Sequence, residues 1–498
     1  MAGIGFELKK LFSKNGFFQS MRAFGYATVI CTGPMLLGVL LLLGMMLLCS
    51  MAKAPLMQRE LLICMITYTL LASLGVTSFF SMVVTRYTAD MLFEEKNKAI
   101  LPSFWGSSVV MLTIGCLLYG IFLLFSGATI LQQILCFVFF GELIIVWNAM
   151  SYLTAIKDYK GIFLSFLTAI FTAFILGAVL LVLRLPVIES LLFSVTTGYG
   201  IMLVWHIILL HRYFPKSDLS AFTFFKWLDE FLPLALSGFF MNIGMFSHLV
   251  IMWFSDIGVQ VHGLFYGAPE HDVPALLAFM TTLITTVNFV VSVEVNFYPK
   301  YRNHYSLYND KGTIHDIMQA ENEMLNTLRT EIFYTALKQL LFTAVSIAAG
   351  GFLLDILPLG FNEMMRGYFR TLCVAYGLYA VGNMPMLILL YFTDYKGALF
   401  TTEIFAGGTV LLTLVSLIFP QVYYGFGFLI ASMAFVLACA ARLDYFTKRL
   451  PYFILAAQPL VPEDKSGKFT RLGTFLENKL EKENWICNII IWVRNLKK

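Results

Sequence analysis

Asp158-Tyr159-Lys160-Gly161 and Asp394-Tyr395-Lys396-Gly397 are the two stretches of sequence that decide the fold. The first follows the fourth long apolar segment and the second follows the tenth, so one short loop occupies the same place in two sets of six segments. Such internal repeats are typical of membrane proteins built by duplication. We therefore expect two pseudo-symmetric six-helix lobes.

The composition indicates a membrane protein. The chain has 498 residues, of which 59% are hydrophobic and only 13% are charged, which excludes an ordinary soluble domain. A helix of about 20 apolar residues crosses a bilayer. The sequence therefore predicts an all-α polytopic membrane protein with twelve transmembrane helices, near residues 26–49, 61–84, 102–126, 131–156, 161–183, 189–210, 229–254, 274–298, 332–354, 368–392, 398–419 and 424–443.

The spans divide the chain into four expected parts. They are an amphipathic N-terminal segment (1–25), an N-lobe with spans one to six (26–213), a C-lobe with spans seven to twelve (214–446) that carries a cytoplasmic helical insert (300–331), and an amphipathic tail (447–498). Because each lobe has an even number of spans, we expect the axis that relates them to run along the membrane normal.

The distribution of Lys and Arg predicts the orientation. With the N-terminus inside, the cytoplasmic segments hold 29 of the 34 basic residues, which follows the positive-inside rule. We therefore expect both termini in the cytoplasm and the chain in the cytoplasmic (inner) membrane. The net charge of +4 then faces anionic lipid headgroups, so it gives no argument for a nucleic-acid partner.

Motifs for cofactors are lacking. The eight cysteines are scattered singly, and no phosphate-binding loop or zinc motif occurs, so we expect no metal or other cofactor. The one acidic and histidine-containing trio in an outer loop is Glu270-His271-Asp272, which leaves a membrane glycosyltransferase as a weak alternative.

Polar side chains share helix faces within several predicted spans. These faces carry amides, hydroxyls and tyrosines, which suit a neutral hydroxylated ligand. The alternative is that they join helices to one another. The candidate residues for a substrate conduit are Asn148, Tyr152, Asn288, Ser292, Tyr376, Tyr379 and Asn383.

Charged residues in or beside the spans are few. Glu142 is the acid deepest in a span and could couple transport to an ion, whereas Arg86 and Asp90 could form a gate or merely support the end of span two. His248 is expected to be a packing residue. No basic residue lies deep in a predicted span.

The chain begins with the stretch Met1–Leu11, MAGIGFELKKL, and span one carries Thr32-Gly33-Pro34. These stretches resemble the PelG family of exopolysaccharide transporters, and the likeness extends over the whole chain in length and span count. The family belongs to the multidrug/oligosaccharidyl-lipid/polysaccharide flippase superfamily, which implies two six-helix lobes.

The resemblance also implies a cargo and partners. The cargo would be a growing polymer rich in N-acetylgalactosamine. The partners would be a cytoplasmic PelF-like glycosyltransferase, a PelD-like cyclic-di-GMP receptor and PelE-like membrane proteins. A cation-coupled small-molecule exporter or a lipid-linked oligosaccharide flippase of the same fold remains the alternative.

Overall fold

Long helices make up almost all of the structure. The computed structural model describes residues 17–156, 158–217, 219–309, 312–356, 362–456 and 467–482. Within these residues, eleven helices are long and apolar enough to cross a membrane, and α2 contributes a shorter apolar stretch, Leu36–Met51. The prediction of an all-helical, multi-pass membrane protein is thus confirmed.

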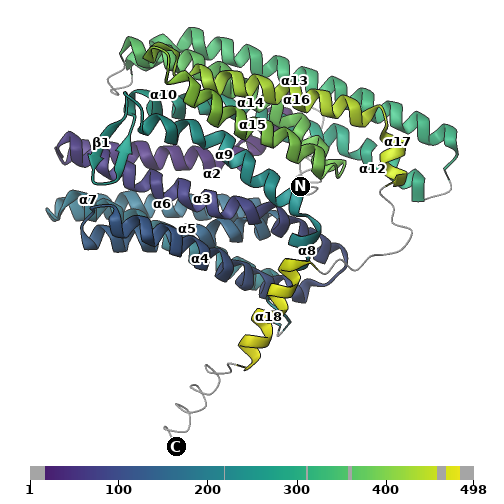
Figure 1. The fold of residues 1–498 in the computed structure, drawn as a ribbon, viewed down its shortest axis with the longest axis horizontal. Coiled ribbons are helices and arrows are strands. Elements are labelled where there is room, and N and C mark those ends of the chain that lie inside the picture. Colours follow the sequence, from purple (N-terminus) through teal and green to yellow (C-terminus); the bar gives the residue numbers. More distant parts are fainter. Residues whose placement is uncertain are drawn as a thin grey trace, which may run out of the picture.

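The first six long helices form the N-lobe, on one side of the molecule in Figure 1. Their shared core is built from fully buried residues such as Leu62, Phe104, Phe140 and Tyr152. The helices are α2 (Phe17–Met51), α3 (Leu56–Phe93), α4 (Ile100–Phe125), α5 (Ile130–Ile156), α6 (Tyr159–Val182) and α7 (Val187–Tyr213).

The C-lobe lies on the other side and follows a short linker helix, α8 (Phe224–Glu230). A two-stranded antiparallel hairpin, β1 (Val259–His262) and β2 (Phe265–Gly267), lies at the end of the molecule opposite α8. The helices of this lobe are α9 (Leu232–Trp253), α10 (Pro269–Phe279), α11 (Leu283–Ser292), α12 (Tyr298–Asn309), α13 (Ile314–Ile356), α14 (Glu363–Tyr391), α15 (Tyr395–Ser416) and α16 (Phe426–Thr447).

The eighth span departs from the single regular helix expected at 274–298. It is a rod from α10 to α12 that changes hydrogen-bonding pattern at a 3-10 turn, Met280–Thr282, and at a π-helical turn, Val293–Phe297. The hydroxyls of Thr281 and Thr282 donate to carbonyls three residues back, at 2.7 and 2.8 Å, which favours the tighter turn there.

The two Asp-Tyr-Lys-Gly loops have the same structure. Asp158 caps α6 and accepts a hydrogen bond from Gly161 N at 2.9 Å, and Asp394 caps α15 and accepts one from Gly397 N at 3.1 Å. Glycine is needed at the third helical position, because a Cβ on Gly397 would lie 2.0 Å from the Asp394 carboxylate. The repeated sequence therefore encodes a helix start used in both lobes.

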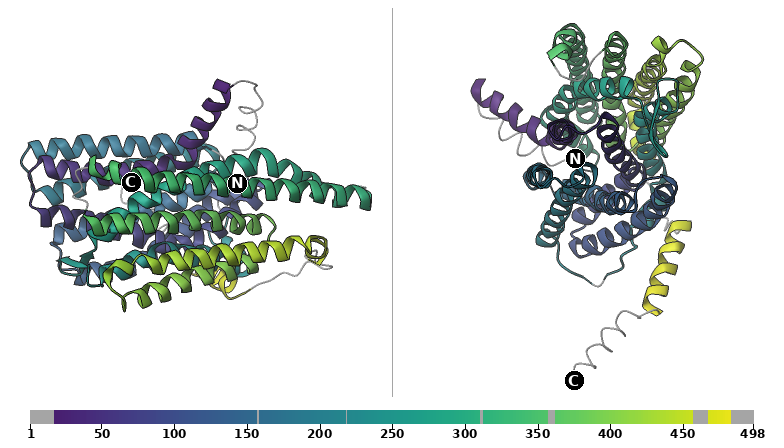
Figure 2. Two further views of the ribbon diagram at one scale, coloured as in Figure 1. Left: turned by 90° about the horizontal axis from the view of Figure 1, so that it is seen from above. Right: turned by 90° about the vertical axis from the view of Figure 1, so that its left-hand side faces the viewer.

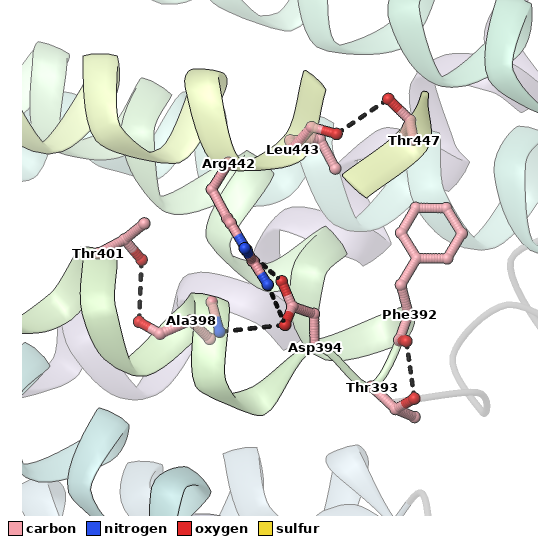
Figure 3. A network of polar contacts seen from close by, with 9 residues as sticks. Phe392, Thr393, Asp394, Ala398, Thr401, Arg442, Leu443 and Thr447 are labelled. Carbon is pink, nitrogen blue, oxygen red and sulfur yellow. Dashed lines mark hydrogen bonds and ion pairs between the residues drawn. The ribbon is translucent and has the colours of Figure 1, made fainter. Parts of the chain in front are cut away.

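Each capping aspartate is also joined to the sixth span of its own lobe, but by a different residue. Arg442 of α16 holds Asp394 through two hydrogen bonds of 2.6 and 2.8 Å (Figure 3). In the N-lobe, Tyr213 of α7 donates a single hydrogen bond of 3.1 Å to Asp158. A bidentate ion pair on a buried carboxylate is the stronger of the two contacts.

The α8 end of the molecule carries two helical extensions. Helices α12 and the first part of α13 form a pair that projects beyond the other helices, which is where the insert at 300–331 lies (Figure 2). Met324 and Leu328 of this pair are buried against α12, whereas Ile314 and Met318 are exposed.

The second extension is α18 (Lys468–Lys482), which packs on α8. Asp229 of α8 accepts hydrogen bonds from Phe469 N, Thr470 N and Thr470 Oγ1. Burial raises the pKa of this carboxyl, but the hydrogen bonds outweigh that effect and leave its pKa below the ordinary value. Of the predicted amphipathic N-terminal segment (1–25), residues 1–16 lie outside the described residues, and so do residues 457–466 and 483–498 of the predicted tail (447–498).

The unequal caps predict unequal sensitivity of the two lobes. Replacing Arg442 with Gln leaves the buried Asp394 carboxylate without its ion pair, so we expect a loss of about 2 kcal/mol in the free energy of unfolding. Tyr213→Phe removes one exposed hydrogen bond and should cost about 0.5 kcal/mol. Thermal unfolding of the two purified variants in detergent compares them, and equal losses would contradict this account.

Candidate functional site

The two lobes meet chiefly where α3 lies against α9. Gly238 of α9 allows the close approach, because a Cβ there would lie 2.6 Å from the carbonyl oxygen of Ser78. Further along, the rings of Tyr68 and Trp253 stack with their centroids 4.5 Å apart. A second interlobe contact joins α2 to α11. Any passage between the lobes is therefore bordered by α2, α3, α9 and α11.

The hairpin closes the interlobe boundary at its own end. Leu264 N donates to Ser126 O at 3.0 Å, and His262 Nε2 lies 3.0 Å from Gly127 O, so the hairpin is seated on the turn after α4. Tyr68 OH both donates to the Tyr266 carbonyl and accepts from its amide, at 3.0 and 3.1 Å. In this structure the lobes are thus bridged by a C-lobe hairpin.

At the α8 end, Arg86 and Asp90 form the ion pair that their spacing suggests, with Nε and Oδ2 3.0 Å apart. Asp90 also accepts a hydrogen bond from Trp227 Nε1 at 2.9 Å, and the Arg86 guanidinium lies over the Phe231 ring. The pair therefore connects α3 to the linker between the lobes. A gating role for it stays a prediction.

Asn148 and Tyr152 lie inside the N-lobe, between α5 and α4. Asn148 Nδ2 donates to the hydroxyls of Ser107 and Ser108 at 2.9 and 2.8 Å. Tyr152 OH lies 3.1 Å from the hydroxyl of Ser103, and both predicted residues are at most 1% exposed. These contacts are those of helix packing, and a conduit role for the two residues stays a prediction.

Tyr376, Tyr379 and Asn383 follow one face of α14 in the C-lobe. Tyr376 is buried, with its OH 3.1 Å from His248 Nε2. Tyr379 stacks on Phe405 at 5.5 Å. Asn383 lies one turn further along and is partly exposed. The tyrosines therefore pack within the lobe, and the pairing of Asn148 with Asn383 across a passage stays a prediction.

Asn288 and Ser292 belong to a line of polar contacts between the eighth span and α13, which we call the polar seam. Asn288 Nδ2 donates to Thr335 Oγ1 at 2.7 Å, and Ser292 donates to Glu331. The seam comprises Thr285, Asn288, Ser292, Asn296 and Lys300 on one side and Thr327, Glu331, Thr335, Lys338 and Gln339 on the other.

The α13 side of the seam was not among the predicted site residues. Thr327, Glu331, Thr335 and Gln339 recur at intervals of four, a helical spacing that could have revealed this face. The statement that no basic residue lies deep in a span is wrong for Lys338. Lys338 Nζ donates to Asn288 Oδ1 at 2.8 Å, and Asn288 lies ten residues before the predicted end of span eight. The long flexible side chain of lysine allows its amine to reach this partner.

Glu142 lies away from the interlobe boundary. It borders a hollow of about 800 Å³ between α5 and α7, lined mainly by α7 residues such as Gly200 and Leu203. Its Oε2 atom is buried and has no hydrogen-bond partner among the described residues. A coupling role for Glu142 stays a prediction.

The seam offers amide, hydroxyl, ammonium and carboxylate groups, which can bind polar ligands without covalent chemistry. Within the residues that the structure describes, no group of three or more His, Cys, Asp or Glu side chains is arranged to hold a metal ion. Among the described residues, the Glu270-His271-Asp272 trio of the weak glycosyltransferase alternative is therefore not arranged as a metal site.

Solved structures share this fold at low sequence identity. A MATE protein in the bent conformation has 13% identity and a TM-score of 0.57, covering 92% of this chain and 99% of its own. An outward-facing MATE-family multidrug resistance transporter of the MOP superfamily has 15% identity and a TM-score of 0.56, covering 86% and 97%. The eukaryotic MATE transporter AtDTX14 has 10% identity and a TM-score of 0.56, covering 94% and 100%. These likenesses confirm the two-lobe fold.

The family follows from the sequence itself. No curated protein matches the chain. A family model named PelG and described as "Putative exopolysaccharide Exporter (EPS-E)" matches residues 1–455, which include both lobes. With the fold of a transporter and a family match over most of its length, this chain belongs to the PelG family of exopolysaccharide exporters.

Proposed function

We propose that the chain exports a growing, largely neutral amino-sugar exopolysaccharide of the Pel type across the cytoplasmic membrane. The polymer moves through a passage between the two lobes, and the polar seam borders its cytoplasmic half. The chain is the membrane component of a biofilm polysaccharide synthesis complex. The family match supports export of a polysaccharide, and the seam supports its route.

The observation that carries this proposal is the partial exposure of ionisable and amide groups within a predicted span. Lys338 is exposed and Asn288 is partly exposed, although both lie in membrane-spanning helices. Such groups are costly in lipid and usually face protein or a water-filled cavity. Since α11 also contacts α2 of the other lobe, the seam is close to the interlobe boundary.

The chemistry of the seam suits a neutral sugar chain. Amides and hydroxyls can exchange their mutual hydrogen bonds for bonds to sugar hydroxyls and acetamido groups. The seam carries two ammonium groups and one carboxylate, and each is bonded to a polar neighbour: Lys338 to Asn288, Lys300 to Thr327, and Glu331 to Ser292 and Asn296. Most of the seam is therefore made of uncharged amides and hydroxyls, with one positive charge in excess.

The partners belong at the α8 end, which the positive-inside rule places in the cytoplasm. There the α12–α13 pair projects beyond the other helices (Figure 2). On this pair, Ile314 is 78% and Met318 59% exposed. Exposed apolar side chains on a projecting helix pair suit protein contacts. A PelF-like glycosyltransferase would dock here, with PelD-like and PelE-like proteins completing the complex.

One observation favours a second candidate function. Lys338, placed within a span, could bind the pyrophosphate of a lipid-linked oligosaccharide. A flippase for such a cargo would depend on the charge of Lys338, whereas an exporter of a neutral polymer would depend on Asn288 at least as strongly.

The orientation predicts which engineered cysteines react from outside. Gln260 lies on the hairpin and Asn303 on α12, and both are exposed. An impermeant thiol reagent added to intact cells should label Gln260→Cys but not Asn303→Cys, because only the hairpin end faces outward. The parent protein, with its eight native cysteines, measures the background. The reverse pattern would overturn the orientation.

The passage predicts a specific loss of export. Asn288→Leu should lower secreted polymer per folded transporter about two- to tenfold, because leucine tolerates membrane surroundings but cannot hydrogen-bond to sugar. Immunoblotting of the folded membrane fraction normalises the secretion measurement. Unchanged polymer per transporter would remove Asn288 from the passage.

Asn148→Leu is the contrasting variant. Its side chain bonds to α4, so the substitution should lower the amount of folded protein through a loss of about 0.6–2 kcal/mol, while polymer per folded transporter stays the same. If polymer per transporter falls as it does for Asn288→Leu, Asn148 belongs to the passage after all.

A further inference from the structure

Two buried histidines and a partly exposed aspartate form a cluster at the hairpin end of the C-lobe. His248 lies on α9, and His271 and Asp272 lie in the first turn of α10. The imidazole rings are 5.3 Å apart, and the residues His248 and His271 are at most 1% exposed. Neither histidine takes part in the polar seam or in the interlobe contacts described above.

Several atoms of this cluster lack hydrogen-bond partners among the described residues. They are both ring nitrogens of His271, Nδ1 of His248 and Oδ1 of Asp272. His271 Nδ1 lies 3.9 Å from Asp272 Oδ1, which is too far for a hydrogen bond. Buried polar atoms without partners are rare in folded proteins, and a site with four of them calls for a physical explanation.

The other oxygen of Asp272 links the cluster to the interlobe boundary. Asp272 Oδ2 accepts a hydrogen bond from Trp253 Nε1 at 2.8 Å and another from Ala268 N at 3.2 Å. Trp253 is the residue whose ring stacks on Tyr68 of the N-lobe. The carboxylate therefore positions the aromatic side chain that joins the two lobes.

The remaining neighbours contribute little compensating charge. Tyr376 bonds to His248, Tyr368 packs against His271, and Cys64 and Tyr68 of α3 face Asp272. The charged groups of the same region have partners elsewhere. Glu270 accepts from Asn362, Asp256 accepts from Tyr424, and Arg366 pairs with Glu363.

We propose that His248, His271 and Asp272 form a binding site for one proton and that occupation of this site stabilises the closed contact between the lobes at the hairpin end. Protonated His271 Nδ1 can donate to Asp272 Oδ1 after a small side-chain movement that closes the 3.9 Å between them, and two unpartnered atoms then form a charge-assisted hydrogen bond. Since the two imidazoles are adjacent, a charge on one disfavours a charge on the other, and the site takes a single proton.

The direction of the coupling follows from hydration. When the hairpin end is closed, Asp272 Oδ1 is buried without a hydrogen-bond partner among the described residues, which is costly for a carboxylate oxygen, so a proton that gives it a donor stabilises the closed end. Separation of Tyr68 from Trp253 would admit water to Asp272 and weaken proton binding. By linkage, acid favours the closed end and alkali favours the open end. This role in closing the hairpin end does not depend on which cargo is carried.

The experiment follows the distance between the hairpin and the N-lobe as the pH changes. Spin labels on Val259→Cys and Ile130→Cys, both exposed positions, report that distance in full-length protein in nanodiscs, in a background without the eight native cysteines. Between about pH 9 and 5, the ratio of closed to open molecules should rise by up to about tenfold per pH unit, the limit for one proton. A distance distribution that does not change with pH would overturn the proposal.

Variants identify the site. His271→Gln keeps a polar side chain but cannot be protonated, so the ratio of closed to open molecules should become independent of pH. His248→Gln is the second variant, to be used if His271→Gln does not fold, and it should reduce the pH dependence of the same ratio. His206→Gln is the matched control, because His206 is equally buried in the N-lobe and lies 2.8 Å from Ser165 Oγ. It should behave as the parent does. A pH dependence that survives in His271→Gln, or disappears in His206→Gln, contradicts the assignment.

Discussion

The close contact between α3 and α9 is the constraint on which the two-lobe arrangement depends. Lipid provides no hydrophobic force to hold helices together, so the lobes must be joined by tight packing and by specific polar contacts. Gly238 permits the backbones to approach, and Tyr68 continues the contact toward the hairpin through Trp253. The linker contacts of Asp90 complete it at the other end. Motion of the lobes must therefore change these contacts and the contact between α2 and α11.

Polar residues in the spans serve two purposes that composition does not distinguish. Asn148 is buried and donates to two serines of the neighbouring helix, so its polarity joins helices within one lobe. Asn288 has the same side chain but lies between Thr335 and an exposed Lys338. The difference is one of burial and partner, because only a partly exposed group can exchange its hydrogen bonds for bonds to a passing ligand.

The sequence was sufficient for the class of fold and for the repeat, because apolar length and the Asp-Tyr-Lys-Gly loops depend on local chemistry. The structure explains the repeated aspartate as a helix cap, which the loop sequence alone did not reveal. The sites were harder to predict. Whether Tyr152 faces a neighbouring helix or a passage depends on how helices rotate about their axes, and a stripe of polar residues does not fix that rotation. Residues of α13 such as Glu331 were missed because they were interpreted as part of a cytoplasmic insert.

The π-helical turn in the eighth span determines which residues can share one face over its whole length. The seam residues of this span recur mostly every four positions, whereas a regular α-helix repeats every 3.6, so such a line would drift around the helix axis. A wider turn at Val293–Phe297 takes up the difference and keeps Asn296 and Lys300 directed at α13. The π-helical turn thus keeps the polar residues before and after it on the same face of the rod. Without its extra residue, the cytoplasmic part of the rod would be rotated by about 100° about the helix axis and would present a different surface to α13.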